Sequence, residues 1–214
     1  VDSDVRRFIF ASSAAVYGDS EDAKKREDML PKPISPYGVS KLAAENYVQV
    51  FNESYGLETV VLRYFNVYGP RQGYTSSYSG VITAFMNRLL KDQPPVIHGD
   101  GKQSRDFVHV DDVVSANMLA LQSKNAVGGV FNIGSGTATT VYELAEILQQ
   151  KTNMERLKPI YTESRAGDIK HCSGDIYKAE EILGFHPQIQ LKDGLSKLVE
   201  WRLHATRAVE RSVL

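Results

Sequence analysis

The stretch Val5-Arg6-Arg7-Phe8-Ile9-Phe10-Ala11-Ser12-Ser13 is typical of a short apolar strand that runs directly into a turn of small residues. A second stretch, residues 59–66 (TVVLRYFN), is rich in β-branched and aromatic side chains and also predicts a strand. Between the two, Ser35 can cap a helix, Pro36 suits its first turn, and apolar residues recur at helical spacing until Gly56. The order strand, helix, strand predicts a crossover unit of a parallel sheet, so we expect an α/β fold.

The rest of the chain alternates between strand-like and helical segments. Residues 19–33 and 69–79 are predicted to be loops, the second long enough to suggest a function. Further strands are expected at 96–98, 107–110 and 130–133, and near 159–161 and 171–173. Further helices are expected at 81–90, from Asp111 or Asp112 to 121, from a Thr140 cap to about 151, at 175–183 and from 192 to about 208.

Composition excludes several classes of function. The 214 residues, 42% hydrophobic and 24% charged, are those of an ordinary soluble globular protein. A net charge of -1 gives no electrostatic reason to expect a nucleic acid or a membrane surface as partner. The single cysteine, Cys172, favours a reducing, cytoplasmic compartment, and no His/Cys cluster predicts a metal site. The chain starts without Met or a signal-peptide pattern, so we expect it to begin inside a longer sequence.

The sharpest chemical signal is Tyr37-Gly38-Val39-Ser40-Lys41, in which a Tyr and a Lys four residues apart share one face of the predicted helix. A tyrosine hydroxyl ordinarily has a pKa of about 10, so a tyrosine base needs positive charge beside it. Lys41, the helix N-terminus and a cationic nicotinamide ring are the candidate sources. Such a pair alone is more often a plain surface pair. Ser13 reverses this preference, because it leaves the carboxyl end of a strand, where open parallel sheets bind ligands.

Five segments, in this order along the chain, resemble the extended short-chain dehydrogenase/reductase superfamily, specifically its UDP-glucose (UDP-galactose) 4-epimerase branch. They are residues 12–18, 37–41, 62–71, 104–112 and 165–168. The resemblance covers nearly the whole chain and implies a Rossmann-type parallel sheet with a smaller α/β substrate-binding domain. The glycine-rich dinucleotide fingerprint has no counterpart here, so we expect the N-terminal half of the sheet, which holds most of the NAD, to be missing.

The implied division gives residues 1–66 and about 105–133 to the NAD-binding domain. It gives about 67–104 and 134–214 to the sugar-nucleotide domain.

The resemblance also implies roles for single residues, with NAD as cofactor and a UDP-sugar as substrate. The catalytic residues would be Ser13, Tyr37 and Lys41. The cofactor contacts would be Ser12, Ser13, Tyr37, Lys41, Tyr64 and Phe65. The substrate contacts would be Asn66, Val81, Val96, His98, Arg105, Arg165, Asp168 and Cys172. The planar guanidinium of arginine suits a diphosphate because it pairs with two phosphate oxygens at once.

Simpler roles remain open for several of these residues. Arg105 could form an ion pair with Asp106, and Arg165 one with Glu163 or Asp168. Val96 and His98 could serve only in strand packing, and Cys172 could be a buried core thiol.

Ala14 and Ala15 indicate the reaction class. Dehydratases and decarboxylases of the superfamily carry an acidic residue soon after the catalytic Ser or Thr, and here these positions are alanines. We therefore expect reversible oxidation at the sugar C4 and nothing further, which is a 4-epimerase acting on UDP-glucose and UDP-galactose through a transient 4-keto sugar. In the family a bulky Tyr at the position of Cys172 excludes N-acetylated sugars, so UDP-GlcNAc and UDP-GalNAc are also expected to be accepted.

The alternatives are a dehydratase or decarboxylase of the same superfamily and a catalytically inert fragment or binding protein. The family typically forms homodimers through the helix expected at 36–55, so a homodimer is implied.

Overall fold

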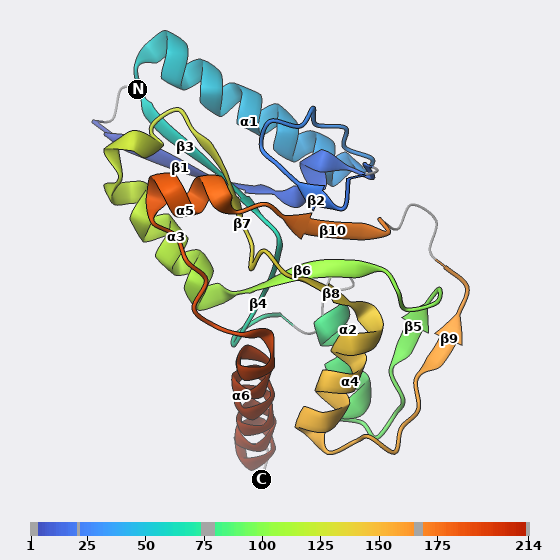
Figure 1. Ribbon diagram of the computed structural model, residues 1–214. Coiled ribbons are helices and arrows are strands. Elements are labelled where there is room, and N and C mark those ends of the chain that lie inside the picture. Colours follow the sequence, from blue (N-terminus) through green and yellow to red (C-terminus); the bar gives the residue numbers. More distant parts are fainter. Residues whose placement is uncertain (1–3, 21, 74–79, 165–168, 213–214) are drawn as a thin grey trace.

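Three parallel strands form the sheet on which the rest of the molecule is built. The computed structural model describes residues 4–20, 22–73, 80–164 and 169–212. Strands β1 (Arg7–Ser13), β3 (Glu58–Tyr64) and β7 (Val130–Ile133) lie in the order β1-β3-β7. Helix α1 (Pro36–Tyr55) joins β1 to β3 and covers one face of this sheet (Figure 1). The predicted crossover unit and the α/β fold class are thus confirmed.

Helices α3 (Val110–Gln122) and α5 (Tyr177–Leu183) cover the opposite face of the sheet. Successive residues of a strand point to opposite faces. Val60 and Leu62 of β3 accordingly pack against α3 and α5, whereas Arg63 turns toward α1. The short 3-10 helices η1 (Ala14–Tyr17) and η2 (Lys124–Ala126) follow β1 and α3.

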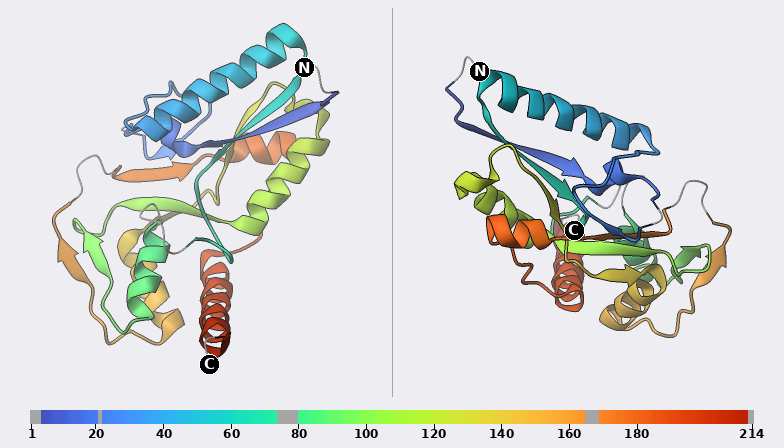
Figure 2. Two further views of the ribbon diagram at one scale, coloured as in Figure 1. Left: turned by 180° about the vertical axis from the view of Figure 1, so that it is seen from behind. Right: turned by 45° about the horizontal axis from the view of Figure 1, so that its top comes forward.

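A second sheet lies below the first and is turned relative to it (Figures 1 and 2). Its parallel strands follow the order β2 (Lys24–Lys25), β10 (His171–Gly174), β6 (Ser104–His109) and β4 (Asn66–Tyr68). Strand β8 (Ala138–Thr140) pairs antiparallel with β6. The chain passes directly from the first sheet to the second at Phe65, between β3 and β4.

Three helices, α2 (Val81–Leu89), α4 (Val141–Thr152) and α6 (Leu191–Ser212), pack around a separate core beneath the second sheet. Strands β5 (Val96–His98) and β9 (Ile160–Thr162) pair in parallel at the periphery. None of the helices in the described ranges is long and apolar enough to cross a membrane.

The helix ends follow the sequence closely at two places. Ser35 caps α1, its hydroxyl accepting a hydrogen bond from the Gly38 N–H at 3.1 Å, and Gly56 ends the helix in the left-handed conformation at φ 68°. Thr140 caps α4 through a capping box with Glu143. These predicted caps are confirmed, because they depend on contacts within a few residues.

Two expectations about strands are corrected. The single strand expected at 59–66 is two strands in two sheets, because the Phe65 side chain joins a buried cluster where the chain changes sheet. The predicted loop 19–33 contains β2, which is held to β10 by parallel pairing of Lys24 with Ser173 and of Lys25 with Gly174. Strand β8 was not expected either. Both short strands exist only because β10 and β6 lie beside them.

The start of α3 is also corrected. The helix begins at Val110, and the cap is His109, whose Nδ1 accepts from the Asp111 N–H at 3.2 Å. Neither Asp111 nor Asp112 caps the helix. The buried Asp112 carboxylate instead accepts the N–H groups of Gln188 and Ile189, at 2.9 and 3.2 Å.

The predicted domain division stays a prediction. Strand β6, in the expected cofactor half, pairs with β4 and β10 of the second sheet, while the helix α3 that follows it packs on the first.

Candidate active site

The three predicted catalytic residues meet at the carboxyl end of β1. Tyr37 opens α1 and is 55% exposed. One turn later, the Lys41 Nζ lies 5.8 Å from the centroid of the Tyr37 ring and donates to the Ala11 carbonyl oxygen at 2.8 Å. Ser13 ends β1, and its Oγ accepts from the Ala15 N–H at 3.2 Å.

Gly38 explains how α1 comes so close to this strand end. A Cβ at Gly38 would lie 2.6 Å from the Ala15 carbonyl oxygen, a separation that real side chains essentially never adopt. The absent side chain therefore lets the first turn of α1 rest on the backbone just after Ser13. Close backbone packing, rather than the Tyr-Lys pair alone, brings the two segments together.

Among the predicted cofactor contacts, Phe65 belongs to a buried cluster with Ala14 and Cys172. The Ser12 hydroxyl donates to the Glu45 carboxylate, and the Tyr64 hydroxyl donates to Asn117 Oδ1 at 2.9 Å. The structure thus uses the hydroxyls of Ser12 and Tyr64 within the fold, and their roles toward a cofactor stay predictions.

Three of the predicted substrate contacts lie on neighbouring strands. Arg105 and Cys172 are register partners on β6 and β10. Asn66, at the start of β4, donates from Nδ2 to the Asp106 carbonyl oxygen at 3.2 Å. The second sheet therefore brings together an arginine, an amide and a small thiol, and the thiol packs in one buried cluster with Phe65. Burial raises the pKa of the Cys172 thiol.

The other predicted substrate contacts lie on different elements. Val96 and His98 are on β5, where the His98 Nδ1 lies 2.9 Å from Thr162 Oγ1 of β9. Val81 begins α2 and packs partly buried against the lower core. Arg165 and Asp168 lie outside the described residues.

The sequence analysis named Asp106 only as a possible ion-pair partner of Arg105 and missed that it ties the second sheet together. Its fully buried carboxylate accepts from the Ser135 N–H and hydroxyl, both at 2.7 Å, and from the N–H groups of Gly136 and Gly174 at 3.0 Å. Burial raises the pKa of Asp106, and these hydrogen bonds act in the opposite direction. The sequence offered little signal for this role, because Asp106 stands among polar residues at the start of β6 (SRDFVH), and only its burial shows that the carboxylate must be satisfied within the fold.

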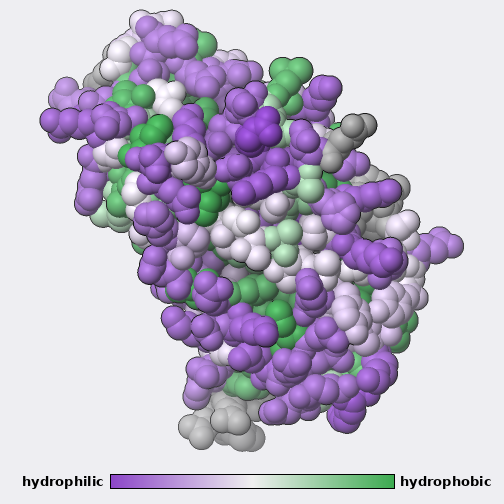
Figure 3. Space-filling view, in the orientation of Figure 1, coloured by the Kyte–Doolittle hydropathy of each residue, from purple (hydrophilic) through white to green (hydrophobic). Residues whose placement is uncertain are grey.

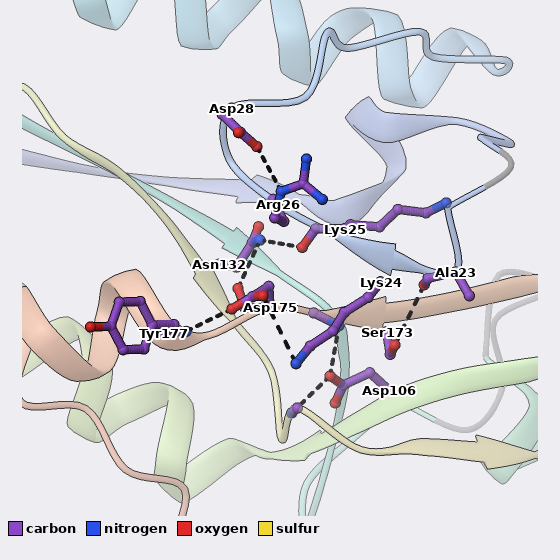
Figure 4. A network of polar contacts seen from close by, with 12 residues as sticks. Ala23, Lys24, Lys25, Arg26, Asp28, Asp106, Asn132, Ser173, Asp175 and Tyr177 are labelled. Carbon is purple, nitrogen blue, oxygen red and sulfur yellow. Dashed lines mark hydrogen bonds and ion pairs between the residues drawn. The ribbon is translucent and has the colours of Figure 1, made fainter.

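Asn132 of β7 is a second residue that the sequence analysis missed. The fully buried side chain accepts from the Tyr17 hydroxyl at 2.6 Å. It also donates to the backbone oxygens of Lys25 and Asp175, at 2.9 and 3.1 Å (Figure 4). Its backbone N–H donates to Glu27 Oε1 at 2.7 Å. One amide thus joins the turn after Ser13 to β2 and to the end of β10.

Metal binding and the protonation of Tyr17 are two further chemical features of this region. Among the described residues, no group of three or more His, Cys, Asp or Glu side chains could hold a metal ion. Burial raises the pKa of Tyr17 to about 12, so its hydroxyl is a proton donor at neutral pH.

A family model described as "NAD dependent epimerase/dehydratase family" matches residues 1–134. The chain belongs to this family. The family prediction and its cofactor, NAD, are thereby confirmed.

The residues at the end of β1 fit such a cofactor. An ammonium has three N–H donors, and Lys41 directs one to Ala11, so it retains donors for a ribose hydroxyl.

Three relatives show where the chain lies within the family. The "Putative UDP-glucose 4-epimerase" of Methanocaldococcus jannaschii is 42% identical over 95% of this chain and 65% of its own length. The solved UDP-N-acetylglucosamine 4-epimerase from Methanobrevibacter ruminantium M1, in complex with UDP-N-acetylmuramic acid, superposes with a TM-score of 0.90 and 38% identity, over 95% of this chain and 65% of that one. The dTDP-D-glucose 4,6-dehydratase of Homo sapiens is 34% identical over 98% of this chain and 61% of its own length.

This chain therefore spans somewhat less than two thirds of the length of each relative. Its relatives are nucleotide-sugar epimerases and dehydratases.

Proposed function

We propose that this protein catalyses the NAD-dependent 4-epimerisation of a UDP-hexose through a transient 4-keto sugar. The observation that carries the proposal is the convergence of Ser13, Tyr37 and Lys41 at the carboxyl end of β1. NAD, when bound, supplies the acceptor for a hydride from the sugar C4 and the donor that returns it.

Each of the three side chains has a distinct part in moving the proton. Tyr37, exposed at the first turn of α1, acts in this proposal as a phenolate, whose oxygen accepts the proton of the sugar 4-hydroxyl and later gives it back. The Lys41 ammonium and the positive end of the α1 dipole place positive charge beside the Tyr37 ring in this role. Ser13 orients the sugar hydroxyl by a hydrogen bond.

The second sheet supplies the other end of the substrate site in this proposal. Arg105 pairs with the diphosphate, and Asn66 contacts it from β4. The small side chain of Cys172 leaves room for an N-acetyl group, so UDP-GlcNAc and UDP-GalNAc are proposed substrates beside UDP-glucose and UDP-galactose. The solved relative from Methanobrevibacter ruminantium M1, named for UDP-N-acetylglucosamine, supports this extension.

A dehydratase is the second candidate, supported by the human relative. Ala14 disfavours it, because this residue lies in the buried cluster beside Phe65 and Cys172 and has no acidic group with which to eliminate water. Product mass separates the two candidates. An epimer keeps the mass of the substrate, whereas dehydration lowers it by one water.

The test uses the protein expressed from its full coding sequence. Incubated with UDP-galactose, the wild type is expected to form UDP-glucose. Tyr37→Phe is expected to lower turnover by about a hundredfold or more while UDP still binds, because only the proton-transferring oxygen is lost. Tyr47→Phe, at an exposed tyrosine of the same helix, is the matched control and should retain turnover. Near-normal turnover of Tyr37→Phe would refute the proposal.

A homodimer through α1 and the cytoplasm as compartment are further proposals. The first is supported by exposed apolar side chains along α1, namely Val39, Tyr47, Val50, Phe51 and Tyr55. The second is supported by the single, unpaired cysteine.

A further inference from the structure

A continuous chain of buried polar contacts runs behind the predicted catalytic residues. The Ser12 hydroxyl donates to Oε1 of Glu45, and Arg63 donates from Nε and Nη2 to the same carboxylate at 2.7 to 3.2 Å. The Arg63 guanidinium lies 4.8 Å from the centroid of the Tyr17 ring, and the Tyr17 hydroxyl donates to Asn132. All five residues are at most 5% exposed.

This chain of contacts is anchored to every element that carries a catalytic residue. Ser12 directly precedes Ser13 in β1, and Tyr17 ends the 3-10 turn that follows it. Glu45 lies one helical turn beyond Lys41 on α1. A displacement of any of these contacts would therefore move the ends of the strand and helix on which the proton transfer depends.

The charged residues Lys41 and Glu45 on α1 indicate what Arg63 does. Lys41 and Glu45 are four residues apart on one helix face, a spacing at which lysine and glutamate ordinarily pair with each other. Here Glu45 instead accepts hydrogen bonds from two nitrogens of Arg63, which lies on β3. Lys41 donates to the Ala11 carbonyl oxygen. Without Arg63, the Glu45 carboxylate would be buried and uncompensated, and the nearest ammonium on its helix would be that of Lys41.

We propose that Glu45 and Arg63 are positioning residues for the epimerisation. They hold Ser12, and with it Ser13, in place, and they keep the Glu45 carboxylate away from Lys41. The predicted effect on turnover rests on the proposed function, whereas the predicted effect on the structure does not.

The structure supplies a matched control. Arg7 lies at the opposite end of β1, and its side chain is 6% exposed like that of Arg63. It also pairs with a glutamate, its register partner Glu58 on β3, at 2.8 Å. Arg7 additionally donates to three carbonyl oxygens at the end of α3, those of Ala120, Leu121 and Ser123. Arg7→Met therefore breaks an ion pair of an equally buried arginine, between β1 and β3 and away from the catalytic residues, although its partner Glu58 is more exposed than Glu45.

The experiment compares Arg63→Met, the double variant Glu45→Met/Arg63→Met and Arg7→Met with the wild type, all expressed from the full coding sequence. The first readout is amide hydrogen exchange without added cofactor. Arg63→Met is expected to speed exchange in peptides covering residues 10–17 and 36–45, and Arg7→Met to speed it at 116–124. Unchanged exchange at 10–17 and 36–45 in Arg63→Met would overturn the proposal.

The second readout is turnover per folded protein with UDP-galactose. Arg63→Met is expected to lower kcat about tenfold or more with KM within about threefold, whereas Arg7→Met leaves both unchanged. The double variant should regain thermal stability, because an apolar pair can replace a buried ion pair, but not kcat, because Ser12 still lacks its partner. Recovery of kcat together with stability would show a merely structural role and overturn the proposal.

The two readouts separate the possible failures. If the wild type does not epimerise UDP-sugars, the proposed function fails and hydrogen exchange alone decides the inference. If Arg63→Met does not fold, the double variant carries both readouts, since it leaves no unpaired charge.

Discussion

Cys172 lies on β10 opposite Arg105, and its thiol is buried in a cluster with Phe65 and Ala14. The proposed function makes this position a determinant of sugar size. Cys172→Tyr is expected to lower kcat/KM for UDP-GlcNAc about tenfold or more relative to that for UDP-glucose, because a ring would fill the space of the N-acetyl group. Parallel coupled assays of the two substrates measure the ratio. Cys172→Ser is the control of equal size, and a ratio unchanged in the Tyr variant would exclude this role.

His109 predicts a pH dependence of stability. Burial and Lys197 lower the pKa of His109, although Asp111 and Asp112 act in the opposite direction. Below the ordinary histidine pKa of about 6.5, the unfolded chain therefore binds a proton that the folded protein resists. The contribution of His109 to the free energy of unfolding is complete above this pH and is lost as the pH falls toward the lowered pKa.

Urea denaturation of the wild type and His109→Gln between about pH 5 and 7.5 measures this effect, which is at most about 1.4 kcal/mol per pH unit. The variant should show the flatter dependence on pH. His204→Gln, at an exposed histidine of α6, controls for the loss of any histidine. Equal slopes for the wild type and His109→Gln would contradict the prediction.

Among the elements, α4 offers a test of local stability. The Thr140 Oγ1 accepts from the Glu143 N–H at 3.1 Å, and the Glu143 carboxylate accepts from the Thr140 N–H at 2.8 Å. The hydrogen bonds from the Thr140 N–H and hydroxyl to the Glu143 carboxylate lower the pKa of Glu143, as expected for a carboxylate that caps a helix in its charged form. Thr140→Ala is expected to cost about 1 kcal/mol of stability, measured by chemical denaturation, because one N–H loses its acceptor.

Thr140→Ser, which keeps the oxygen, should lie within a few tenths of a kcal/mol of the wild type. A cost for Thr140→Ala no larger than that for Thr140→Ser would show that the cap is not what stabilises α4.

Among the elements, the sequence predicted the helices and the short strands β5 and β7, but it missed β2 and β8. The caps of α1 and α4 follow from residues three apart, so their ends were found. Strand β2 is only two residues long and β8 three, and neither has a periodic pattern of its own. Their structure comes from pairing with β10 and β6, which no local signal specifies.

Exposed apolar side chains on α1 bear on whether the whole molecule forms a dimer. Val39, Tyr47 and Val50 are at least half exposed, and the stacked rings of Phe51 and Tyr55 extend the same apolar surface. On the face drawn in Figure 3, hydrophobic and hydrophilic side chains are interspersed. If α1 pairs with a second copy, burying these side chains drives association.

The double variant Tyr47→Glu/Val50→Glu is therefore expected to convert a dimer into a monomer, as measured by light scattering after size-exclusion chromatography. Met118→Glu, at a half-exposed apolar residue of α3, is the control and should leave the mass unchanged. A wild-type protein that is already monomeric would exclude the proposed homodimer, and dissociation by Met118→Glu would place the interface elsewhere.

The sequence by itself determined the crossover unit, the ends of its helix and the family, because strand period, capping and motif order are local properties of the chain. Only the tertiary structure decided the partners of the buried polar groups. Glu45 and Arg63 are 18 residues apart, Asp106 and Gly174 are 68 apart, and Tyr17 and Asn132 are 115 apart. A buried charge or amide requires a hydrogen-bond partner, but the identity of that partner depends on how strands and helices pack. The candidate catalytic residues could therefore be named from the sequence, whereas the buried residues that hold them in place could not.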